Sequence, residues 1–308
     1  MKNVLMIGGS YFVGRVFCIQ APRTGNFEIT SINRGRSPIN KPHVREFHFD
    51  RNDGEAIREQ LLPQLGEEKF DALIDTCAYE PGQIRSAIEQ FGDRIGQYIY
   101  FSTASVYSTD DLSMRHEGDP VMPEPKEHTQ NGDYVYKKLL LENELIEECT
   151  KRGIPYTILR PTIIFGPLNY TPRESKYIEL IARGHVVPLL VGAPAKFNMV
   201  YVIDISRALQ LMVGDERAYN EIFNLAAPEI IDRPFFYESL ERFNGEPFQK
   251  REYTIEEAPG QDIPLTLPTV YDELYSGEKF AKTFDFQYTP YEEAMKNTFD
   301  IFKSLFVS

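Results

Sequence analysis

Short apolar runs, separated by amphipathic stretches, recur through the first half of the chain. Their length is typical of strands, and they lie at residues 4–7, 27–32, 44–49, 72–76, 97–101 and 154–159. Amphipathic stretches at 11–20, 81–91 and 134–151 predict helices between some of them. Strands that alternate with helices in this rhythm predict an α/β fold with a doubly wound parallel sheet. The run at 4–7 is apolar throughout, which suits a strand buried on both faces, whereas residues 44–49 alternate.

The alternation breaks after residue 166. Helices are predicted at 174–183, 204–213 and 235–243 and from about 291 onward, with strands at 197–203 and 223–225. Residues 247–290 contain many prolines and are predicted to be irregular. We therefore expect a sheet domain over 1–166, completed by about 200–226. A smaller portion, formed by 167–199 and 227–308, is expected to bind substrate.

Composition restricts the class of protein. The chain has 308 residues, of which 42% are hydrophobic and 26% charged, as in ordinary globular proteins. Its net charge of −13 argues against a nucleic-acid partner, because such binders need basic faces. Three widely spaced cysteines and five histidines suggest neither a disulfide framework nor a metal site. With no signal peptide or membrane span in the pattern, we expect a cytoplasmic location and no membrane partner.

The loop from Gly8 to Gly14, Gly-Gly-Ser-Tyr-Phe-Val-Gly, follows the first strand and opens the first helix. A helix N-terminus after a glycine turn binds phosphate through its backbone N–H groups and its dipole. Gly8 suits the tight turn, and Gly14 lets helix and strand approach closely. Tyr11 stands where the common motif has its middle glycine. The predicted phosphate contacts are Gly8, Ser10, Tyr11, Phe12, Val13 and Gly14; a glycine-rich turn without a ligand is the alternative.

The second predicted strand ends at Asn33-Arg34, where dinucleotide-binding folds contact the adenosine ribose. An acidic residue there binds the 2′-hydroxyl, whereas an arginine accommodates a 2′-phosphate. The chain has no acid here, so NAD(P) is expected, with NADP slightly favoured; a solvated basic turn is the alternative. Asp50 either reaches the adenine or caps the next helix.

Two further segments carry candidate chemistry at the same sheet edge. The fifth strand runs into hydroxyl-bearing residues 102–107, and Tyr134 and Lys138 are four apart on a predicted helix. A second Tyr-x-x-x-Lys match, Tyr275 and Lys279, follows no strand that ends in hydroxyls and has a glycine between its members. We therefore prefer the first pair and treat the second as a chance match.

These segments together resemble the extended short-chain dehydrogenases/reductases, the NAD-dependent epimerase/dehydratase family, over nearly the whole chain. The motifs that carry the resemblance are the Gly8–Gly14 loop, Ser102-Thr103-x-x-Val106-Tyr107, Tyr134-x-x-x-Lys138-Leu139-x-x-Glu142, Arg160-Pro161 through Gly166-Pro167, and Val202-Ile203-Asp204. The altered glycine loop and the segment 166–170 look most like an atypical branch that includes the chloroplast stem-loop RNA-binding proteins. Some of these lack the catalytic tyrosine, which this chain keeps. The resemblance implies a Rossmann-type fold.

The resemblance also implies roles for individual residues. Tyr134 would take a proton from a substrate hydroxyl, with Thr103 hydrogen-bonded to the same oxygen. A nearby ammonium and an oxidised nicotinamide favour the phenolate, and Lys138 would also hold the nicotinamide ribose. A tyrosine and lysine that merely pack on a helix are the alternative. The remaining expected cofactor contacts are Arg51, Ala78, Pro161 and Ile164, and the expected substrate contacts are Tyr79, Ser105, Asn169 and Lys196.

Departures from the family pattern leave the substrate open. Ala104 and Ser105 stand where dehydratases carry an acidic pair, which argues against dehydration. Phe197, beside Lys196, stands where epimerases for uridine-diphosphate sugars place an arginine. The leading function is an NAD(P)-dependent oxidoreductase or epimerase acting on a hydroxyl or keto group, with a nucleotide-sugar 4-epimerase as one form. An NADP-dependent carbonyl reductase and a non-catalytic nucleotide- or RNA-binding relative are the alternatives.

The resemblance finally implies a homodimer, because related enzymes pair two long helices from each subunit. The candidates are the helices near 82–91 and 134–150. Apolar residues at helical spacing on the second helix are Leu139, Leu140, Leu145 and Ile146.

Overall fold

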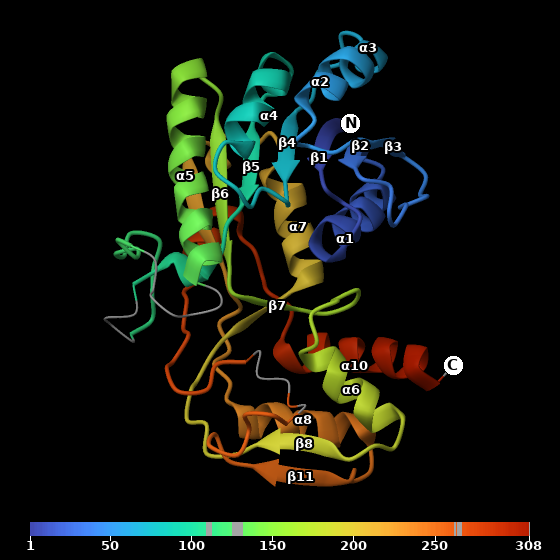
Figure 1. Ribbon diagram of the computed structural model, residues 1–308, viewed down its shortest axis with the longest axis vertical. Helices are drawn as coiled ribbons and strands as arrows, with labels where there is room; N and C mark the ends of the chain where they lie inside the picture. Colours follow the sequence, from blue (N-terminus) through green and yellow to red (C-terminus); the bar gives the residue numbers. More distant parts are fainter. Residues whose placement is uncertain (109–112, 125–131, 262, 264–266, 308) are drawn as a thin grey trace.

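The computed structural model describes residues 1–108, 113–124, 132–261, 263 and 267–307, and its centre is a seven-stranded parallel sheet (Figure 1). In spatial order the strands are β10 (Glu221–Leu225), β6 (Tyr156–Pro161), β5 (Tyr98–Phe101), β4 (Ala72–Asp75), β1 (Lys2–Ile7), β2 (Phe27–Asn33) and β3 (Val44–His48). All neighbours pair in parallel. The predicted doubly wound α/β fold is therefore confirmed.

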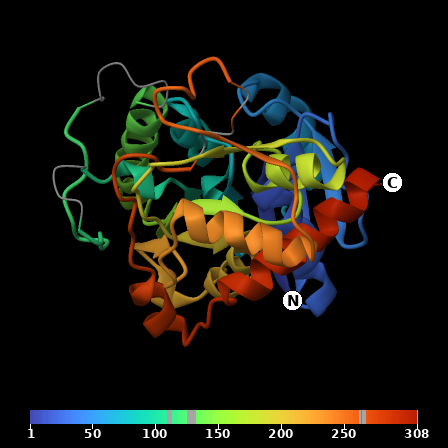
Figure 2. The same ribbon diagram turned by 90° about the horizontal axis from the view of Figure 1, so that it is seen from below.

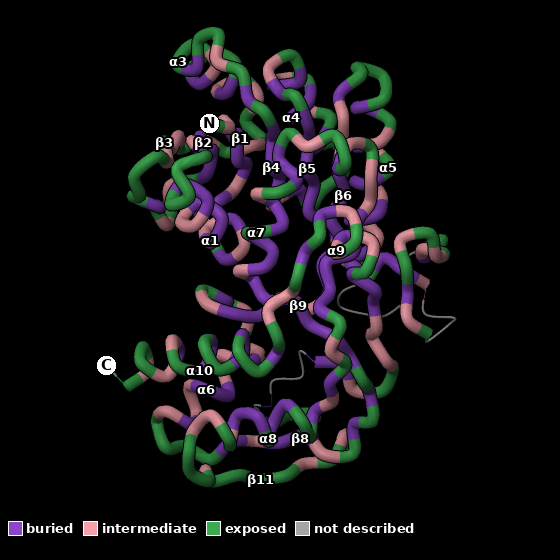
Figure 3. The backbone as a smooth tube through the Cα atoms, turned by 180° about the vertical axis from the view of Figure 1, so that it is seen from behind, coloured by how far each residue is buried: buried purple, intermediate pink, exposed green. Residues whose placement is uncertain are grey.

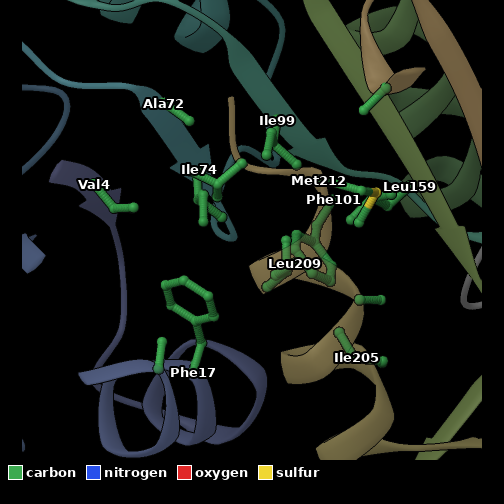
Figure 4. Close-up of a cluster of buried hydrophobic side chains, with 14 of the residues drawn as sticks. Val4, Phe17, Ala72, Ile74, Ile99, Phe101, Leu159, Ile205, Leu209 and Met212 are labelled. Atoms are coloured by element: carbon green, nitrogen blue, oxygen red, sulfur yellow. The ribbon is translucent and has the colours of Figure 1, made fainter. Parts of the chain in front are cut away.

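Helices cover both faces of this sheet. One face carries α1 (Phe12–Gln20), α7 (Val202–Met212) and α9 (Glu278–Phe284). The other carries α4 (Gln83–Phe91), α5 (Gly132–Arg152) and a helical stretch formed by α2 (Gly54–Ala56), a π-helical turn (Ile57–Leu61) and α3 (Leu62–Leu65). Along β1, Val4 and Met6 join the first core and Leu5 and Ile7 the second. Figure 4 shows the first core, with side chains of α1 and α7 facing the sheet.

A smaller part follows the point where the chain leaves β6 (Figures 1 and 2). It contains the paired short strands β7 (Ile163–Phe165) and β9 (Met199–Tyr201), the pair β8 (Val187–Leu190) and β11 (Lys250–Tyr253), and the helices α6 (Glu174–Ala182), α8 (Arg233–Asn244) and α10 (Tyr291–Val307). It has its own apolar core, in which Tyr177, Phe236, Met295 and Phe299 are fully buried. The domain boundaries given above stay a prediction.

The C-terminal third differs from the sequence-based prediction. Residues 247–290 are not irregular throughout, since they contain β11 and α9. β11 is an exposed, charged edge strand without an apolar pattern, and it forms by backbone pairing with β8 (Figure 3). The strand predicted at 197–203 is shorter, because the chain turns into α7 at Val202.

No helix in the described ranges is long and apolar enough to cross a lipid bilayer.

Candidate active site

A cavity of about 1050 Å³ lies at the carboxyl ends of β1, β2, β4 and β5, beside the N-terminal turn of α5 and the crossing from β6 to β7. In Figure 1, β4 and β5 end toward the smaller part of the molecule. Ligands of doubly wound sheets bind at this edge. Residues of the main sheet part and of the smaller part line this cavity.

The glycine loop forms one end of the cavity, and its backbone requires glycine at two positions. Gly8 has a φ of +109°, and a Cβ there would lie 2.4 Å from Thr76 Oγ1. A Cβ on Gly14 would lie 2.8 Å from the Cα of Gly9, so only glycine allows α1 to pack this closely. Phe12, at the start of α1, has a φ of +35°, an uncommon value for a residue with a side chain. The roles predicted for Gly8 and Gly14 thus have a steric basis.

The Oγ of Ser10 is buried in this loop without a hydrogen-bond partner among the described residues. Arg15 ties the loop to the segment after β2, since its Nη1 donates to Ser10 O and Ser37 Oγ at 3.2 and 3.1 Å. The buried hydroxyl and the open start of α1 suit an anionic ligand.

The end of β2 presents Arg34 but not the Asn33 amide. Asn33 Nδ2 donates to Ser31 Oγ and Glu46 Oε1, both at 3.1 Å, and its Oδ1 accepts from Gly35 N at 2.8 Å. Both ends of this amide are therefore used within the chain, and Asn33 shapes the turn. Arg34 and Arg36 are exposed, line the cavity, and have no hydrogen-bond or ion-pair partner in the described ranges.

Arg51 lines the cavity but is held by a buried network. Its Nη1 lies 2.7 Å from Asp75 Oδ1 and its Nη2 donates to Gln83 O. Tyr98 donates its hydroxyl hydrogen to Asp75 Oδ2 at 2.7 Å. Although burial opposes it, the pKa of Asp75 is lowered by the adjacent guanidinium of Arg51. Asp50 also lines the cavity, whereas Asp53 caps α2 by accepting from Ala56 N.

The structure brings Lys138 and Tyr134 together at the N-terminal turn of α5. Lys138 is only 2% exposed and donates to the carbonyl oxygens of Ala78 and Phe101 at 2.9 and 2.8 Å. The rings of Tyr79 and Tyr100 lie 4.6 and 4.9 Å from its Nζ. Burial lowers the pKa of Lys138 to about 8, against the opposing charge of Asp75.

The expected lowering of the Tyr134 pKa by Lys138 is not found. The Nζ of Lys138 is 5.8 Å from the Tyr134 ring centroid and is directed to backbone carbonyls. Loss of water around the phenol, with a contribution from Tyr170, raises the pKa of Tyr134 to about 12. In the protein alone, Tyr134 is therefore a protonated phenol at neutral pH.

Thr103 and Ser105 lie in the cavity wall beside this pair. Thr103 Oγ1 accepts from Ser105 N at 3.2 Å and so caps a short 3₁₀ turn. The neighbouring Ser102 Oγ is buried and has no partner within the described residues. The hydroxyl-bearing residues Ser102, Thr103 and Ser105, which follow β5, thus all line the cavity.

Several cavity residues were missed from the sequence. The smaller part contributes Tyr170, Thr171, Arg173, Glu273 and Tyr275. The ring of Tyr170 lies 6.1 Å from that of Tyr11 and 6.3 Å from that of Phe12, which joins the smaller part to the glycine loop. Tyr275 was treated as part of a chance match, but it lines the cavity. Lys279 instead pairs with Glu221, so the second tyrosine and lysine do not act as a pair.

Three predicted contacts do not line the cavity. Ala78 is fully buried and contributes only its carbonyl to Lys138. Asn169 is buried and donates to Glu174 Oε1 at 2.8 Å. Lys196 is exposed outside the cavity, where its backbone N–H donates to Asp272. The cavity lining does include the other predicted residues: Gly8, Ser10, Tyr11, Phe12, Val13, Gly14, Asn33, Arg34, Asp50, Arg51, Tyr79, Thr103, Ser105, Tyr134, Lys138, Pro161 and Ile164.

Residues 83–226 match the model of the NAD dependent epimerase/dehydratase family. This range is just under half of the chain. It includes Thr103, Tyr134 and Lys138 and begins after the glycine loop.

Two curated relatives of the chain differ from each other in their names. The chain is 28% identical over 244 residues to the chloroplast stem-loop binding protein of 41 kDa b from Arabidopsis thaliana, covering 75% of this chain and 60% of that protein. It is 26% identical over 247 residues to N-acetyl-alpha-D-glucosaminyl-diphospho-ditrans,octacis-undecaprenol 4-epimerase from Escherichia coli O157:H7, covering 75% and 68%. The chain thus spans about 60% of the length of the chloroplast protein.

Solved structures of low sequence identity have the same fold. The UDP-glucuronic acid 4-epimerase from Bacillus cereus, solved in complex with NAD, superposes on this chain with a TM-score of 0.76. It is 15% identical, and the alignment covers 98% of this chain and 97% of that one. The likeness therefore extends over both parts of the molecule.

Proposed function

We propose that the protein is an NAD(P)-dependent epimerase or oxidoreductase that acts on a hydroxyl or keto group of a small substrate, with a nucleotide sugar as the leading candidate. One observation carries this proposal. A single cavity is lined by a glycine loop at a helix N-terminus and by Thr103, Tyr134 and Lys138. A phosphate-binding loop and a proton-transferring phenol are the two parts that such chemistry requires.

The residues present fit a dinucleotide. The close approaches at Gly8 and Gly14 leave a cradle that a Cβ would fill. The partnerless Ser10 Oγ lies in that loop, and the partnerless Ser102 Oγ lies near the tyrosine and lysine. The glycine loop would hold the diphosphate, and Arg34 and Lys138 would hold the two riboses. When bound, the nicotinamide supplies the acceptor for the two electrons that the substrate loses.

The chain's own groups would move the proton. We assign to Tyr134 the transfer of the proton between a substrate hydroxyl and the resulting carbonyl oxygen, because Lys138 directs its Nζ to the carbonyl oxygens of Ala78 and Phe101. Thr103 would donate or accept a hydrogen bond at the same oxygen. Because the protein alone holds the pKa of Tyr134 at about 12, the positive charge of an oxidised nicotinamide is needed to favour the phenolate.

The first test replaces Tyr134. Tyr134→Phe removes only the hydroxyl and should lower turnover roughly 10²- to 10⁴-fold, the usual effect of one positioned acid–base group. The measurement is conversion of UDP-glucose and UDP-glucuronate by the purified protein with added NAD or NADP, followed by chromatography of the sugars.

The matched control is Tyr136→Phe, on the same helix outside the cavity lining; Tyr275→Phe is unsuitable because Tyr275 lies in the cavity. Equal, small effects of Tyr134→Phe and Tyr136→Phe on a confirmed substrate would refute a catalytic role for Tyr134.

Preference for NADP is the finer part of the proposal, and it rests on Arg34. Arg34→Ala should weaken NADP binding roughly tenfold to a hundredfold and leave NAD nearly unchanged, since a charge-assisted hydrogen bond contributes roughly 1.5–3 kcal/mol. Calorimetric titration with each cofactor measures this difference. Arg45→Ala is the control, because Arg45 lies on β3 and pairs with Glu68. Equal losses for both cofactors would mean that Arg34 does not contact the 2′-phosphate.

The alternatives make different predictions for the same preparation. An epimerase has to keep its reduced cofactor, so denaturing the purified protein should release bound NAD(H); a carbonyl reductase should release little. The name of the chloroplast relative favours stem-loop RNA as a second candidate ligand. Salt-dependent binding of a stem-loop RNA, unchanged by Tyr134→Phe, together with no turnover, would support that alternative.

A further inference from the structure

Arg173 is a cation that the smaller part of the molecule places in the cavity wall. It lies in the segment between β7 and α6 and directly precedes α6. Tyr170, three residues earlier, is close enough to raise the pKa of Tyr134. Arg173 and Tyr134, the phenol proposed to transfer the proton, line the same cavity.

The guanidinium of Arg173 has no polar partner among the described residues. Its Nε is buried and makes no hydrogen bond. Two fully buried arginines have polar partners: Arg160 binds Glu142 through two nitrogens, and Arg233 donates to the carbonyl oxygens of Leu267 and Pro268. Burying a charged group without a partner is costly, so an unpaired guanidinium at a cavity wall indicates a missing anion.

The nearest carboxylates do not supply that anion. Glu174 is 1% exposed, and its Oε1 accepts from Asn169 Nδ2 and Gly166 N at 2.8 and 3.1 Å. Burial raises the pKa of Glu174. Glu273 also lines the cavity. Both carboxylates favour the charged form of Arg173, yet burial outweighs them, so the pKa of Arg173 is lowered.

We propose that Arg173 binds an oxyanion of the substrate, a phosphate or a carboxylate, and so selects for negatively charged substrates. This proposal rests on the proposed function, in which the cavity holds a substrate beside the cofactor. A planar guanidinium can donate two parallel N–H groups to either oxyanion, which a neutral sugar cannot match.

The test measures binding rather than turnover. Protein saturated with NAD, which fills the phosphate site of the glycine loop, is titrated calorimetrically with UDP, with D-glucuronate and with neutral methyl glucoside. The variants are Arg173→Gln, Arg173→Lys and the control Arg183→Gln. Arg183 lies just beyond the other end of α6, pairs with Glu179 and does not line the cavity. Thermal unfolding of each variant shows whether it folds.

We expect Arg173→Gln to weaken binding of UDP or of D-glucuronate roughly tenfold to a hundredfold. Arg173→Lys should recover part of this loss, and Arg183→Gln should bind like the wild type. A loss for UDP alone identifies the anion as a phosphate, and a loss for D-glucuronate alone identifies it as a carboxylate. If Arg173→Gln binds both probes like the wild type, or if the wild type binds neither, the proposal is wrong.

Failure of the proposed function gives a different result. In that case NAD does not bind, or Tyr134→Phe leaves turnover unchanged, whatever the effect of Arg173→Gln on anion binding.

Discussion

Lys138 combines a charge with nearly complete burial. Its ammonium contacts two carbonyl oxygens and three tyrosine rings, and these contacts offset only part of the lost hydration. The pKa of Lys138 therefore falls from 10.5 to about 8 in the folded protein. At pH values between about 8 and 10.5, Lys138 is mostly protonated in the unfolded chain and mostly deprotonated in the folded protein. Unfolding then takes up a proton, so raising the pH disfavours unfolding.

The burial of Lys138 therefore predicts how the stability of the protein depends on pH. The free energy of unfolding of the wild type, minus that of Lys138→Met, should increase by about 2 kcal/mol between pH 8 and pH 10. Urea denaturation of both proteins at several pH values measures the difference. Lys137→Met, which removes an exposed lysine paired with Glu80, should give a difference that stays nearly constant. A constant difference for Lys138→Met as well would contradict the lowered pKa.

Site residues that belong to a local sequence motif were predicted, whereas a residue that depends on contacts between distant segments was not. Gly8, Gly14, Tyr134 and Lys138 were predicted because each belongs to a motif of fixed spacing attached to one strand or helix. Tyr275 was dismissed because its pairing with Lys279 was judged to be a chance match. The residue nevertheless lines the cavity, since the isolated bridge between Phe197 and Glu273 brings its segment there. A contact between residues so far apart in the chain leaves no periodic pattern.

At the scale of elements, a buried ion pair fixes the helix that carries Tyr134 and Lys138, the pair proposed to act in catalysis. Glu142, on α5, accepts from Arg160 Nε and Nη2 at 3.0 and 2.6 Å, and Arg160 lies at the end of β6. The guanidinium also stacks on Tyr107, 4.8 Å from its ring centroid. Glu142 and Arg160 both belong to motifs identified in the sequence, but neither was given a role there. In the structure, their ion pair holds α5 against the sheet.

Breaking this pair should destabilise the fold. Glu142→Gln leaves a buried guanidinium uncompensated and should cost about 3–5 kcal/mol of unfolding free energy. Glu147→Gln, on the exposed face of the same helix, should cost well under 1 kcal/mol. The double variant Glu142→Leu/Arg160→Met should recover much of the loss, because both charges are then removed. Urea denaturation provides the values, and a small loss for Glu142→Gln alone would contradict this role.

Elements with a regular pattern were predicted well, and elements without one were not. Inner strands of the main sheet such as β1 and β4 carry buried runs, which the sequence displays directly, and the edge strand β3, Val-Arg-Glu-Phe-His, alternates. β8 and β11 were missed because β11 reads Lys-Arg-Glu-Tyr and gains its conformation from pairing with a distant strand. α9 did carry a signal, since Phe280 and Phe284 are spaced by one helical turn and are both buried in the main core.

At the scale of the whole molecule, dimerisation through α4 and α5 stays a prediction. Leu139 and Leu145 are buried within the chain, and Ile146 packs against the same core, which leaves mainly Leu140 for a partner. We expect light scattering at micromolar concentration to show a dimer that Leu140→Asp shifts toward the monomer. Leu211→Asp, on α7, is the control and should leave the dimer intact. A wild-type monomer under these conditions would rule out this assembly.

The contact of Tyr170 with Tyr11 and Phe12 has a kinetic consequence. It joins the smaller part to the loop proposed to hold the diphosphate, so a dinucleotide would leave only after these rings separate. An aromatic pair contributes about 0.5–1.5 kcal/mol, which corresponds to a roughly two- to tenfold longer residence time for each pair. An epimerase needs the same cofactor molecule for both half-reactions, whereas a reductase must exchange it in every cycle. Tyr11, which replaces the usual middle glycine, would then favour the cycle of an epimerase, in which the cofactor stays bound.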